Sequence, residues 1–394
     1  MRLGQNRQTF TVNFNFAASI VKGADANGTL GKADAPYGVR TGVQFPLALK
    51  ANGTPSIQPN YMASSFQQMH SIDLTGLLST DYAYRPNNVF SGTYDGGKGK
   101  GFVIKGLSSR FIGEFNHRQG LFPMIQSAEL RNIAVRVEND ITIKWNPGVD
   151  AAFGCLAGVA VDSTIKDCSV APLLDNSIAT ITLAELKPQG GKYQDNEGNN
   201  IGGLVGYAKN TSIDSSSVSN ISLNVKSSDS TWKTDSVRLG LVIGKLDAVK
   251  GVDEEAAVYD GLTAKSVTLV DEGASTTNTQ SLGGIVGQLV VPDGGTVSAS
   301  KWNVDTCVLE KPALGKRSLL LAGGFIGARI GTVAFANCSC SGMVLKKPNG
   351  EQESLDTVLV GTDAIEGSAS GDTDTIEDDE PVDADVIESS NSEK

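Results

Sequence analysis

The sequence predicts an all-β protein built as a parallel β-solenoid, in which the chain winds into stacked coils. Composition and an internal repeat carry this prediction. Forty-five glycines and only 6% aromatic residues among 394 disfavour a helical protein and suit short strands joined by tight turns. A glycine-rich motif also returns at intervals of roughly forty residues, and such self-similarity is typical of a solenoid or a propeller.

The motif places glycines around a pair of aliphatic residues. Its closing glycines, at 158, 206, 244, 287 and 327, are 48, 38, 43 and 40 residues apart, and a partial copy ends at Gly361. In a solenoid, equivalent aliphatic side chains stack about 4.8 Å apart inside a narrow core. We therefore expect Leu204, Ile285 and Phe325 to share one column. We expect the glycines to turn the backbone and to permit close approach at the corners.

A second unit follows each copy and is expected to form an inward strand. It reads aliphatic, two residues, a small or sulfur residue, one residue, aliphatic; the copies are Ile165-Cys168-Val170, Ile213-Ser216-Val218, Leu262-Lys265-Val267, Val304-Cys307-Leu309 and Phe335-Cys338-Cys340. The unit begins 7, 7, 18, 17 and 8 residues after the closing glycine. Two coils therefore carry insertions, which loops tolerate. The variable offsets favour one coil with an excursion per repeat over two short coils.

One copy departs from the pattern. Residues 239–244 lack the double glycine, and Lys265 replaces the small residue of the second unit. We expect this coil to be distorted or to face solvent.

The two ends of the chain differ from the repeats. Residues 1–35, with the alternating stretch TFTVNFNF at 9–16, are expected to form an N-terminal cap or the end of a preceding domain, and the solenoid to span 36–361. Residues 362–394 hold 12 of the 44 acidic residues and one of the 33 basic ones. This tail is expected to be disordered. The remaining body is neutral and lacks a basic stripe, which argues against nucleic-acid binding.

The sequence predicts neither a membrane span nor a secretory signal at the start of the chain. Residues 318–336 are largely apolar, but Arg329 lies in their middle and they contain a copy of the repeat, so we expect buried strands and no membrane span. The opening MRLGQNRQTF is polar where a secretory signal would be apolar. The expectation is that the protein stays inside or that the chain is a fragment.

Several motifs precede the repeats in a fixed order. They are PYGVRTGVQFPLAL (36–49), SFQQMHSIDLTG (65–76), VFSGTYDGGKGKGFVIKGL (89–107) and GLFPMIQSAELRNIAVRV (120–137). This order, followed by the GGLVG copies, resembles the GLUG-repeat proteins, bacterial surface and secreted proteins whose modules occur in adhesins and in N-terminal regions of immunoglobulin A peptidases. The resemblance implies a right-handed β-helix, an extracellular or cell-surface location and a monomeric module of a larger protein. It implies no particular ligand.

Catalytic, metal and cofactor sites are not expected. The only histidines, His70 and His117, lack a HExxH motif or a cysteine partner at zinc spacing. Residues 95–99 lack the Walker spacing and are predicted to form a turn. The five cysteines are too sparse for a disulfide framework. We expect free thiols, with Cys307 and Cys338 adjacent in one column, and leave open a pairing of Cys155 with Cys168.

These observations favour a non-enzymatic rod. It would present loops at 171–201, 226–237, 245–260 and 288–303 to a host-surface protein or glycan, or act as a rigid spacer. Aromatic residues expected on exposed loops are candidate ligand contacts, although each could instead cap a hydrophobic edge: Trp145, Tyr193, Trp232, Tyr259 and Trp302. The alternative function is a polysaccharide lyase or glycoside hydrolase, with candidate carboxylates at Asp247, Asp253, Glu254 and Glu255.

Overall fold

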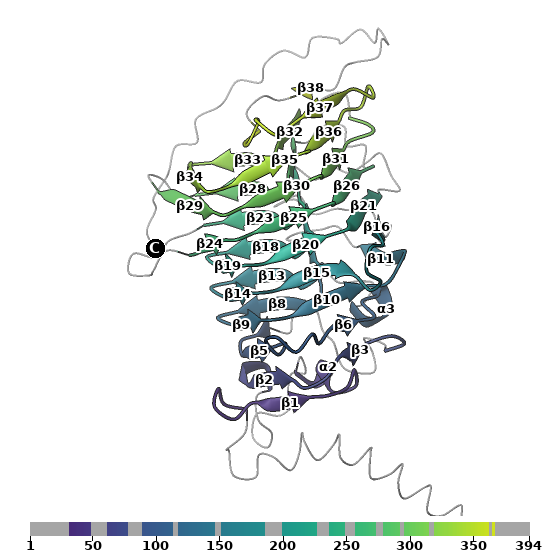
Figure 1. Ribbon diagram of the computed structural model, residues 1–394, viewed down its shortest axis with the longest axis vertical. Helices are drawn as coiled ribbons and strands as arrows, with labels where there is room; N and C mark the ends of the chain where they lie inside the picture. The colour runs from purple at the N-terminus through teal and green to yellow at the C-terminus, as the bar shows by residue number, and fades with distance from the viewer. Residues whose placement is uncertain are drawn as a thin grey trace, which may run out of the picture.

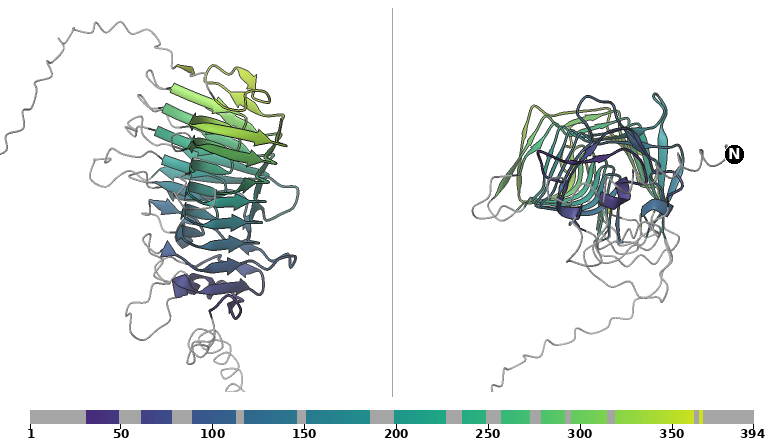
Figure 2. Two further views of the ribbon diagram at one scale, coloured as in Figure 1. Left: turned by 90° about the vertical axis from the view of Figure 1, so that its left-hand side faces the viewer. Right: turned by 90° about the horizontal axis from the view of Figure 1, so that it is seen from below.

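The protein is a rod of stacked β-coils, so the predicted parallel β-helix is confirmed (Figure 1). The computed structural model describes residues 31–48, 61–77, 89–112, 117–145, 151–185, 199–226, 236–248, 257–272, 279–291, 295–314, 319–361 and 365–366. Each complete coil contributes one strand to each of five sheets, here named A to E in the order in which a coil visits them. Seen along the rod, the strands of successive coils superimpose (Figure 2).

Sheets A and B carry the glycine motif at their junction. Sheet A contains β7 (Arg118–Gln119), β12 (Ala152–Gly154), β17 (Asn199–Gly202), β22 (Ser236–Gly240), β27 (Thr279–Gly283), β32 (Leu319–Gly323) and β38 (Ile365–Glu366). Sheet B contains β4 (Val89–Phe90), β8 (Phe122–Gln126), β13 (Ala157–Val161), β18 (Val205–Lys209), β23 (Ile243–Asp247), β28 (Val286–Val290) and β33 (Ile326–Ile330).

Sheets C and D follow in each coil. Sheet C contains β1 (Tyr37–Val39), β2 (Ser65–Gln68), β5 (Thr93–Asp95), β9 (Glu129–Arg131), β14 (Thr164–Lys166), β19 (Ser212–Asp214), β24 (Tyr259–Asp260), β29 (Thr296–Ser300) and β34 (Thr332–Ala336). Sheet D contains β3 (Ile72–Asp73), β6 (Ile104–Lys105), β10 (Ala134–Val137), β15 (Ser169–Pro172), β20 (Ser217–Ser219), β25 (Thr263–Lys265), β30 (Asn303–Asp305) and β35 (Ser339–Ser341).

Sheet E completes the coil, and the sequence reading missed it. It contains β11 (Ile141–Trp145), β16 (Ala179–Glu185), β21 (Ile221–Lys226), β26 (Thr268–Asp271), β31 (Val308–Glu310), β36 (Val344–Lys346) and β37 (Gln352–Ser354). Strand β16 lies inside the predicted loop 171–201, and β29 of sheet C lies inside the predicted loop 288–303. Both loop predictions are therefore wrong over these strands.

The predicted column of aliphatic residues exists. The backbone N–H of Ile285 donates to Phe325 O at 2.9 Å, and that of Leu204 donates to Val242 O at 3.0 Å. All four side chains are buried. The stretch with the altered glycines keeps the same register, since Leu239 and Gly240 pair with Ile201 and Gly202. The expected distortion of that coil is therefore absent.

The motif glycines serve close approach and not turning. A Cβ on Gly206 would lie 2.6 Å from the backbone nitrogen of Phe153 in the preceding coil, a distance that no real side chain occupies. None of the motif glycines has a positive φ. At the corner between sheets C and D the left-handed backbone is supplied chiefly by other residues, with φ of 56° at Asn132, 53° at Asp167 and 54° at Lys301.

The second unit was placed correctly in three of five copies. In the other two, sheet pairing shows that the true units are Tyr259-Leu262-Ala264 and Ala299-Trp302-Val304. Both copies follow the longest insertions, where spacing from the closing glycine no longer fixes the register. Lys265 therefore does not interrupt the core; it is exposed and its Nζ lies 3.4 Å from Asp305 Oδ2. Each repeat forms one coil with an excursion, as predicted.

Aromatic rings gather at both ends of the core. At the first end, Phe45 of α2 (Phe45–Ala48) contacts Tyr94, Phe111 and Phe122, with ring centroids 5.5 to 6.2 Å apart. Helix α3 (Ser109–Ile112) lies near this end (Figure 1), and the 3-10 turn η1 (Tyr61–Ala63) contacts α2 and β4. At the other end, the rings of Trp302, Phe325 and Phe335 pack together.

The terminal predictions fall largely outside the described residues. These include the stretch 9–16 and the acidic tail except for Ile365 and Glu366, which form β38 antiparallel to β32. Residues 319–323, 326–330 and 332–336 of the apolar stretch form strands β32, β33 and β34, as expected. The expected burial is wrong for β34, in which no residue is buried because it is the last described strand of sheet C. Among the described residues there is no helix long and apolar enough to cross a membrane.

Candidate functional site

The five candidate aromatic residues do not share one environment. Tyr259 and Trp302 are 2% and 0% exposed, so their predicted place on exposed loops is wrong. Tyr259 occupies the first position of the true second unit in its coil, and Trp302 occupies the small-residue position of the next. The indole Nε1 of Trp302 donates a hydrogen bond to Tyr259 O at 3.1 Å. Trp302 is thus a buried core residue near the second end of the rod, packed against Phe335 of the following coil.

The other three candidates attach at one corner of the rod. Trp145 is the last residue of β11, and Tyr193 and Trp232 lie outside the described residues, between β16 and β17 and between β21 and β22. Because β11, β16 and β21 are consecutive neighbours in sheet E, these three residues belong to three successive coils. They come from the same corner, the passage from sheet E to sheet A.

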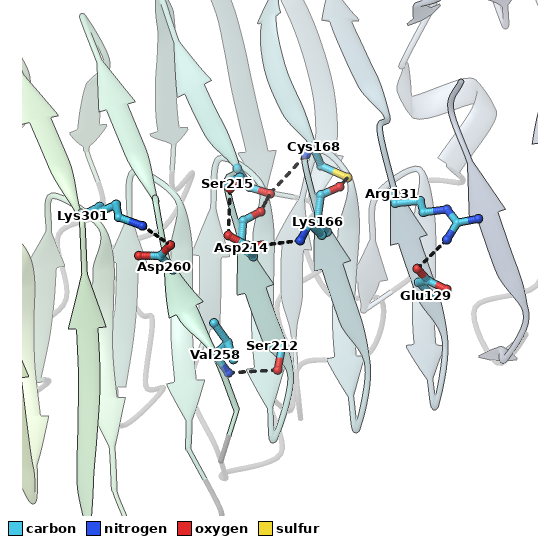
Figure 3. Close-up of polar contacts among 11 residues, drawn as sticks. Glu129, Arg131, Lys166, Cys168, Ser212, Asp214, Ser215, Val258, Asp260 and Lys301 are labelled. Atoms are coloured by element: carbon cyan, nitrogen blue, oxygen red, sulfur yellow. Dashed lines mark hydrogen bonds and ion pairs between the residues drawn. The ribbon is translucent and has the colours of Figure 1, made fainter. Parts of the chain in front are cut away.

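The outer face of sheet C carries a row of charges that the sequence reading did not single out. We call it the sheet C charge row: Lys166 of β14, Asp214 of β19, Asp260 of β24 and Lys301 after β29 (Figure 3). Lys166 Nζ lies 2.9 Å from Asp214 Oδ2, and Lys301 Nζ lies 2.9 Å from Asp260 Oδ2. Two carboxylates from neighbouring coils therefore stand side by side between two ammonium groups.

The charge row keeps both carboxylates ionised. Partial burial opposes ionisation of Asp214, but hydrogen bonds from Lys166 and Ser215 outweigh it and hold its pKa below the usual value. The pKa of Asp260 is lowered by hydrogen bonds from Lys301 and Ser300. A glycosidase needs one carboxyl group that stays protonated as the general acid. This pair therefore lacks the division of roles that such chemistry requires.

A similar arrangement occurs nearer the first end of sheet C. Arg131 Nε lies 3.0 Å from Asp95 Oδ2, and Arg131 Nη1 lies 3.0 Å from Glu129 Oε1. Burial raises the pKa of Asp95, but hydrogen bonds from Gly97, Asn132 and Arg131 outweigh it and the pKa is lowered. The Gly97 N–H contact at 2.8 Å closes the turn that was predicted for residues 95–99. The single guanidinium of Arg131 therefore pairs with two carboxylates.

The carboxylates proposed for the enzymatic alternative gain no support. Asp247 Oδ2 accepts a hydrogen bond from the Tyr207 hydroxyl at 2.6 Å and lies 3.1 Å from Lys245 Nζ. Asp253, Glu254 and Glu255 lie outside the described residues. Across the described part of the chain, no three or more His, Cys, Asp or Glu side chains gather in a way that could hold a metal ion.

Three of the five cysteines, Cys155, Cys168 and Cys307, are buried core residues, whereas Cys338 and Cys340 are half-buried in the last coil. All five are free, and burial raises the pKa of Cys155 and of Cys168 to about 12. Cys338 lies in the same column as Trp302, whose backbone N–H donates to Cys338 Sγ at 3.3 Å. Cys307 instead lies at the next corner of its coil, between sheets D and E, just before β31. The predicted stacking of Cys307 on Cys338 is therefore wrong, for the same register reason.

A signal for the charge row was present in the sequence. Lys166 and Asp214 each directly follow the residue that opens the second unit, so they fall on the outer face of one sheet. Asp260 gave no such signal, because the unit of its coil was placed at Leu262 instead of Tyr259. The pairing of these residues was hidden because the partners are about one repeat apart in sequence. A scan against protein-family models finds no match for this chain, and no curated protein matches it. The GLUG-repeat resemblance stays a prediction.

Proposed function

We propose that this chain is a non-enzymatic β-helix module of a bacterial cell-surface or secreted protein, which presents chain excursions to a host-surface protein or glycan. The observation that carries the proposal is that the same two sheets are linked in the same way on consecutive coils. On five consecutive coils, a stretch of chain connects the strand of sheet E to the strand of sheet A. The intervals are 146–151, 186–198, 227–235, 272–278 and 311–318.

The remaining candidate aromatic residues belong to three consecutive coils: Trp145 ends β11, Tyr193 falls in 186–198 and Trp232 in 227–235. Neighbouring coils are about 4.8 Å apart, so the attachment points of Trp145, Tyr193 and Trp232 fall within about 10 Å along the rod. Aromatic rings stack on sugar rings and anchor protein partners.

Glycan binding is the test of this proposal. The chain and its Tyr193→Ala/Trp232→Ala variant are applied to a glycan array, with Lys192→Ala/Lys233→Ala as the matched control from the same two intervals. We expect the aromatic variant to lose more than about tenfold in affinity, since two stacking contacts are worth over 1.4 kcal/mol. The lysine control should bind as the unaltered chain does.

Two outcomes would contradict the proposed binding role. A blank array together with a blank pulldown from host-cell surface extracts, both at high protein concentration, would remove the binding role and leave the spacer role. Equal binding by both double variants would show that the aromatic corner is not the contact. The enzymatic alternative would need sugar release from a polysaccharide that is lost in Asp253→Asn/Glu254→Gln.

A further inference from the structure

At the second end of the rod, the described residues close three sheets and leave two without a further strand. Sheet E ends in the antiparallel strand β37, sheet A in the antiparallel strand β38, and sheet B in a bridge between Ile326 and Val360. Among the described residues, β34 and β35 are the last strands of sheets C and D. Each of them has a neighbouring strand on one side only.

The backbone of β34 has groups that point to the open side. The N–H of Lys301 donates to Ala336 O at 2.9 Å, so Ala336 directs its backbone toward β29. In a parallel ladder alternate residues address the same neighbour. The N–H and C=O groups of Val333 and Phe335 therefore face the side where no further strand is described.

This edge also carries no charged residue and no proline that could protect it. Exposed edges are normally blocked by a lysine, a proline or a bulge. From Gly331 to Gly342 the chain contains no charged residue and no proline. The inward side chains of the last coil are only half-buried: Val333, Phe335, Cys338 and Cys340. Their equivalents one coil earlier are at most 7% exposed: Val297, Ala299, Trp302 and Val304. One further strand on this edge would complete the burial of these side chains.

The chain contains a segment whose composition suits such an additional strand of sheet C. Residues 9–16, TFTVNFNF, alternate Phe or Val with Thr or Asn and carry no charge. In the described coils, sheet C likewise turns apolar side chains inward and small hydroxyl side chains outward, at Thr93, Thr164, Ser212 and Ser298. Strand β34 itself reads Thr-Val-Ala-Phe-Ala, with the same alternation.

The segment is attached at the opposite end of the rod. Gly31 O accepts a hydrogen bond from the Ser65 N–H at 2.7 Å, beside β2 (Figure 1). The eight steps from β1 to β34 span about 38 Å along the axis. The linking residues 17–30 reach about 46 Å when fully extended. A return to β34 of the same copy would need an almost straight link across the rod, whereas a second copy imposes no such demand.

We propose that residues 9–16 of one copy add as a strand to β34 of the next copy, so that rods join head to tail. The contact is heterologous, because the donor and acceptor surfaces differ, and it repeats from copy to copy. Main-chain hydrogen bonds to Val333 and Phe335 would supply affinity, and the Phe side chains would cover the half-buried coil. This inference goes beyond the proposed function and departs from the monomer expected from the sequence.

Sedimentation velocity on the full chain over a range of concentrations tests the proposal. Phe14→Asp alters the apolar face of the donor, with Asn13→Asp as its polar-face control. Val333→Pro removes an N–H that faces the open side, with Val333→Ala as the control that keeps it. We expect the two controls and the unaltered chain to form concentration-dependent oligomers, and Phe14→Asp and Val333→Pro to sediment as monomers.

Mixing decides the topology. Phe14→Asp retains the acceptor edge and Val333→Pro retains the donor segment, so their mixture should form one-to-one dimers and nothing larger. A monomeric unaltered chain at every concentration, or a mixture that stays monomeric, would overturn the proposal. Circular dichroism checks that each variant folds, and Val333→Lys serves as the second acceptor variant, since lysine blocks edge strands without removing a backbone donor.

Discussion

Lys311 and Asp271 are the least expected residues inside the rod. They continue an inward column of sheet E that begins with Ile143, Leu183 and Val225, and their side chains are 0% and 3% exposed. Lys311 Nζ lies 2.9 Å from Asp271 Oδ2 and also donates to the Asp271 carbonyl at 3.2 Å. Burial removes the hydration of both charges, and the attraction between them offsets part of that cost.

Removing one partner of this pair should cost far more than replacing both. We expect Lys311→Met to lower the free energy of unfolding by about 3–5 kcal/mol, since it removes the cation that lies beside the buried Asp271 carboxylate. The double variant Asp271→Leu/Lys311→Met should recover most of that loss. Urea unfolding of the single and double variants measures the difference. Additive losses would show that the two side chains are not coupled.

The closing glycines give a second prediction for single residues. Gly206→Ala places a methyl group against the backbone of Phe153, and the two backbones must move apart. We expect a loss of about 1–3 kcal/mol in urea unfolding. Gly38→Ala is the matched control, because its nearest neighbours are the flexible side-chain ends of Arg40 and Met69. Equal midpoints for the two variants would contradict the close approach.

At the level of the strand, ion pairs link one coil to the next. Lys105 Nζ of β6 lies 2.9 Å from Asp73 Oδ2 of β3 in sheet D, and Lys346 Nζ of β36 lies 3.0 Å from Glu310 Oε2 of β31 in sheet E. The sheet C charge row repeats the arrangement. Such exposed pairs add little stability each, but their carboxylates set how the rod responds to acid.

Acid should weaken the rod through these carboxylates. Hydrogen bonds from Thr75 and Lys105 lower the pKa of Asp73 from 3.8 to about 2. A folded-state pKa below the unfolded one stabilises the fold above pH 3.8, and that stabilisation is lost as the pH falls toward 2. Urea midpoints of the unaltered chain should therefore decline over this interval. Asp73→Asn should decline less steeply; parallel curves would rule out a contribution from Asp73.

At the scale of the whole molecule, coils behave as interchangeable layers. Gly202 pairs with Gly240 one coil later, so the two positions are structurally equivalent. In a solenoid each repeat contacts chiefly its neighbours, and stability is close to a sum over repeats and their interfaces. Removing a full coil in register should therefore preserve the columns above and below.

Deletion of residues 203–240 is the corresponding prediction. It joins Gly202 to Leu241 and should yield a folded, shorter rod with a β-rich circular dichroism spectrum and a lower unfolding midpoint. Deletion of 222–259 removes the same number of residues but joins Ile221 of sheet E to Asp260 of sheet C. That variant should not fold. Similar spectra and midpoints for both deletions would argue against coil-by-coil stacking.

The sequence by itself determined the fold class and the identity of the main column. Where few residues separate the glycine motif from the second unit, as between Gly206 and Ile213, spacing fixes the register, because stacked coils must repeat the same path. The second units that follow the insertions were predicted a few residues too late in the sequence. Tyr259 and Trp302 were therefore assigned to loops, although both lie in the core. An insertion removes the link between sequence distance and position in the coil.

Only the tertiary structure decided which polar groups meet. Asp214 and Lys166 are 2.9 Å apart although 48 residues separate them along the chain, a distance that no local pattern encodes. The buried pair of Lys311 and Asp271 and the open edge of β34 depend on the same stacking of distant segments. The periodicity of the sequence shows which residues occupy equivalent positions in successive coils. Which side chains meet across coils depends on the register of the strands, and packing of the whole rod sets that register.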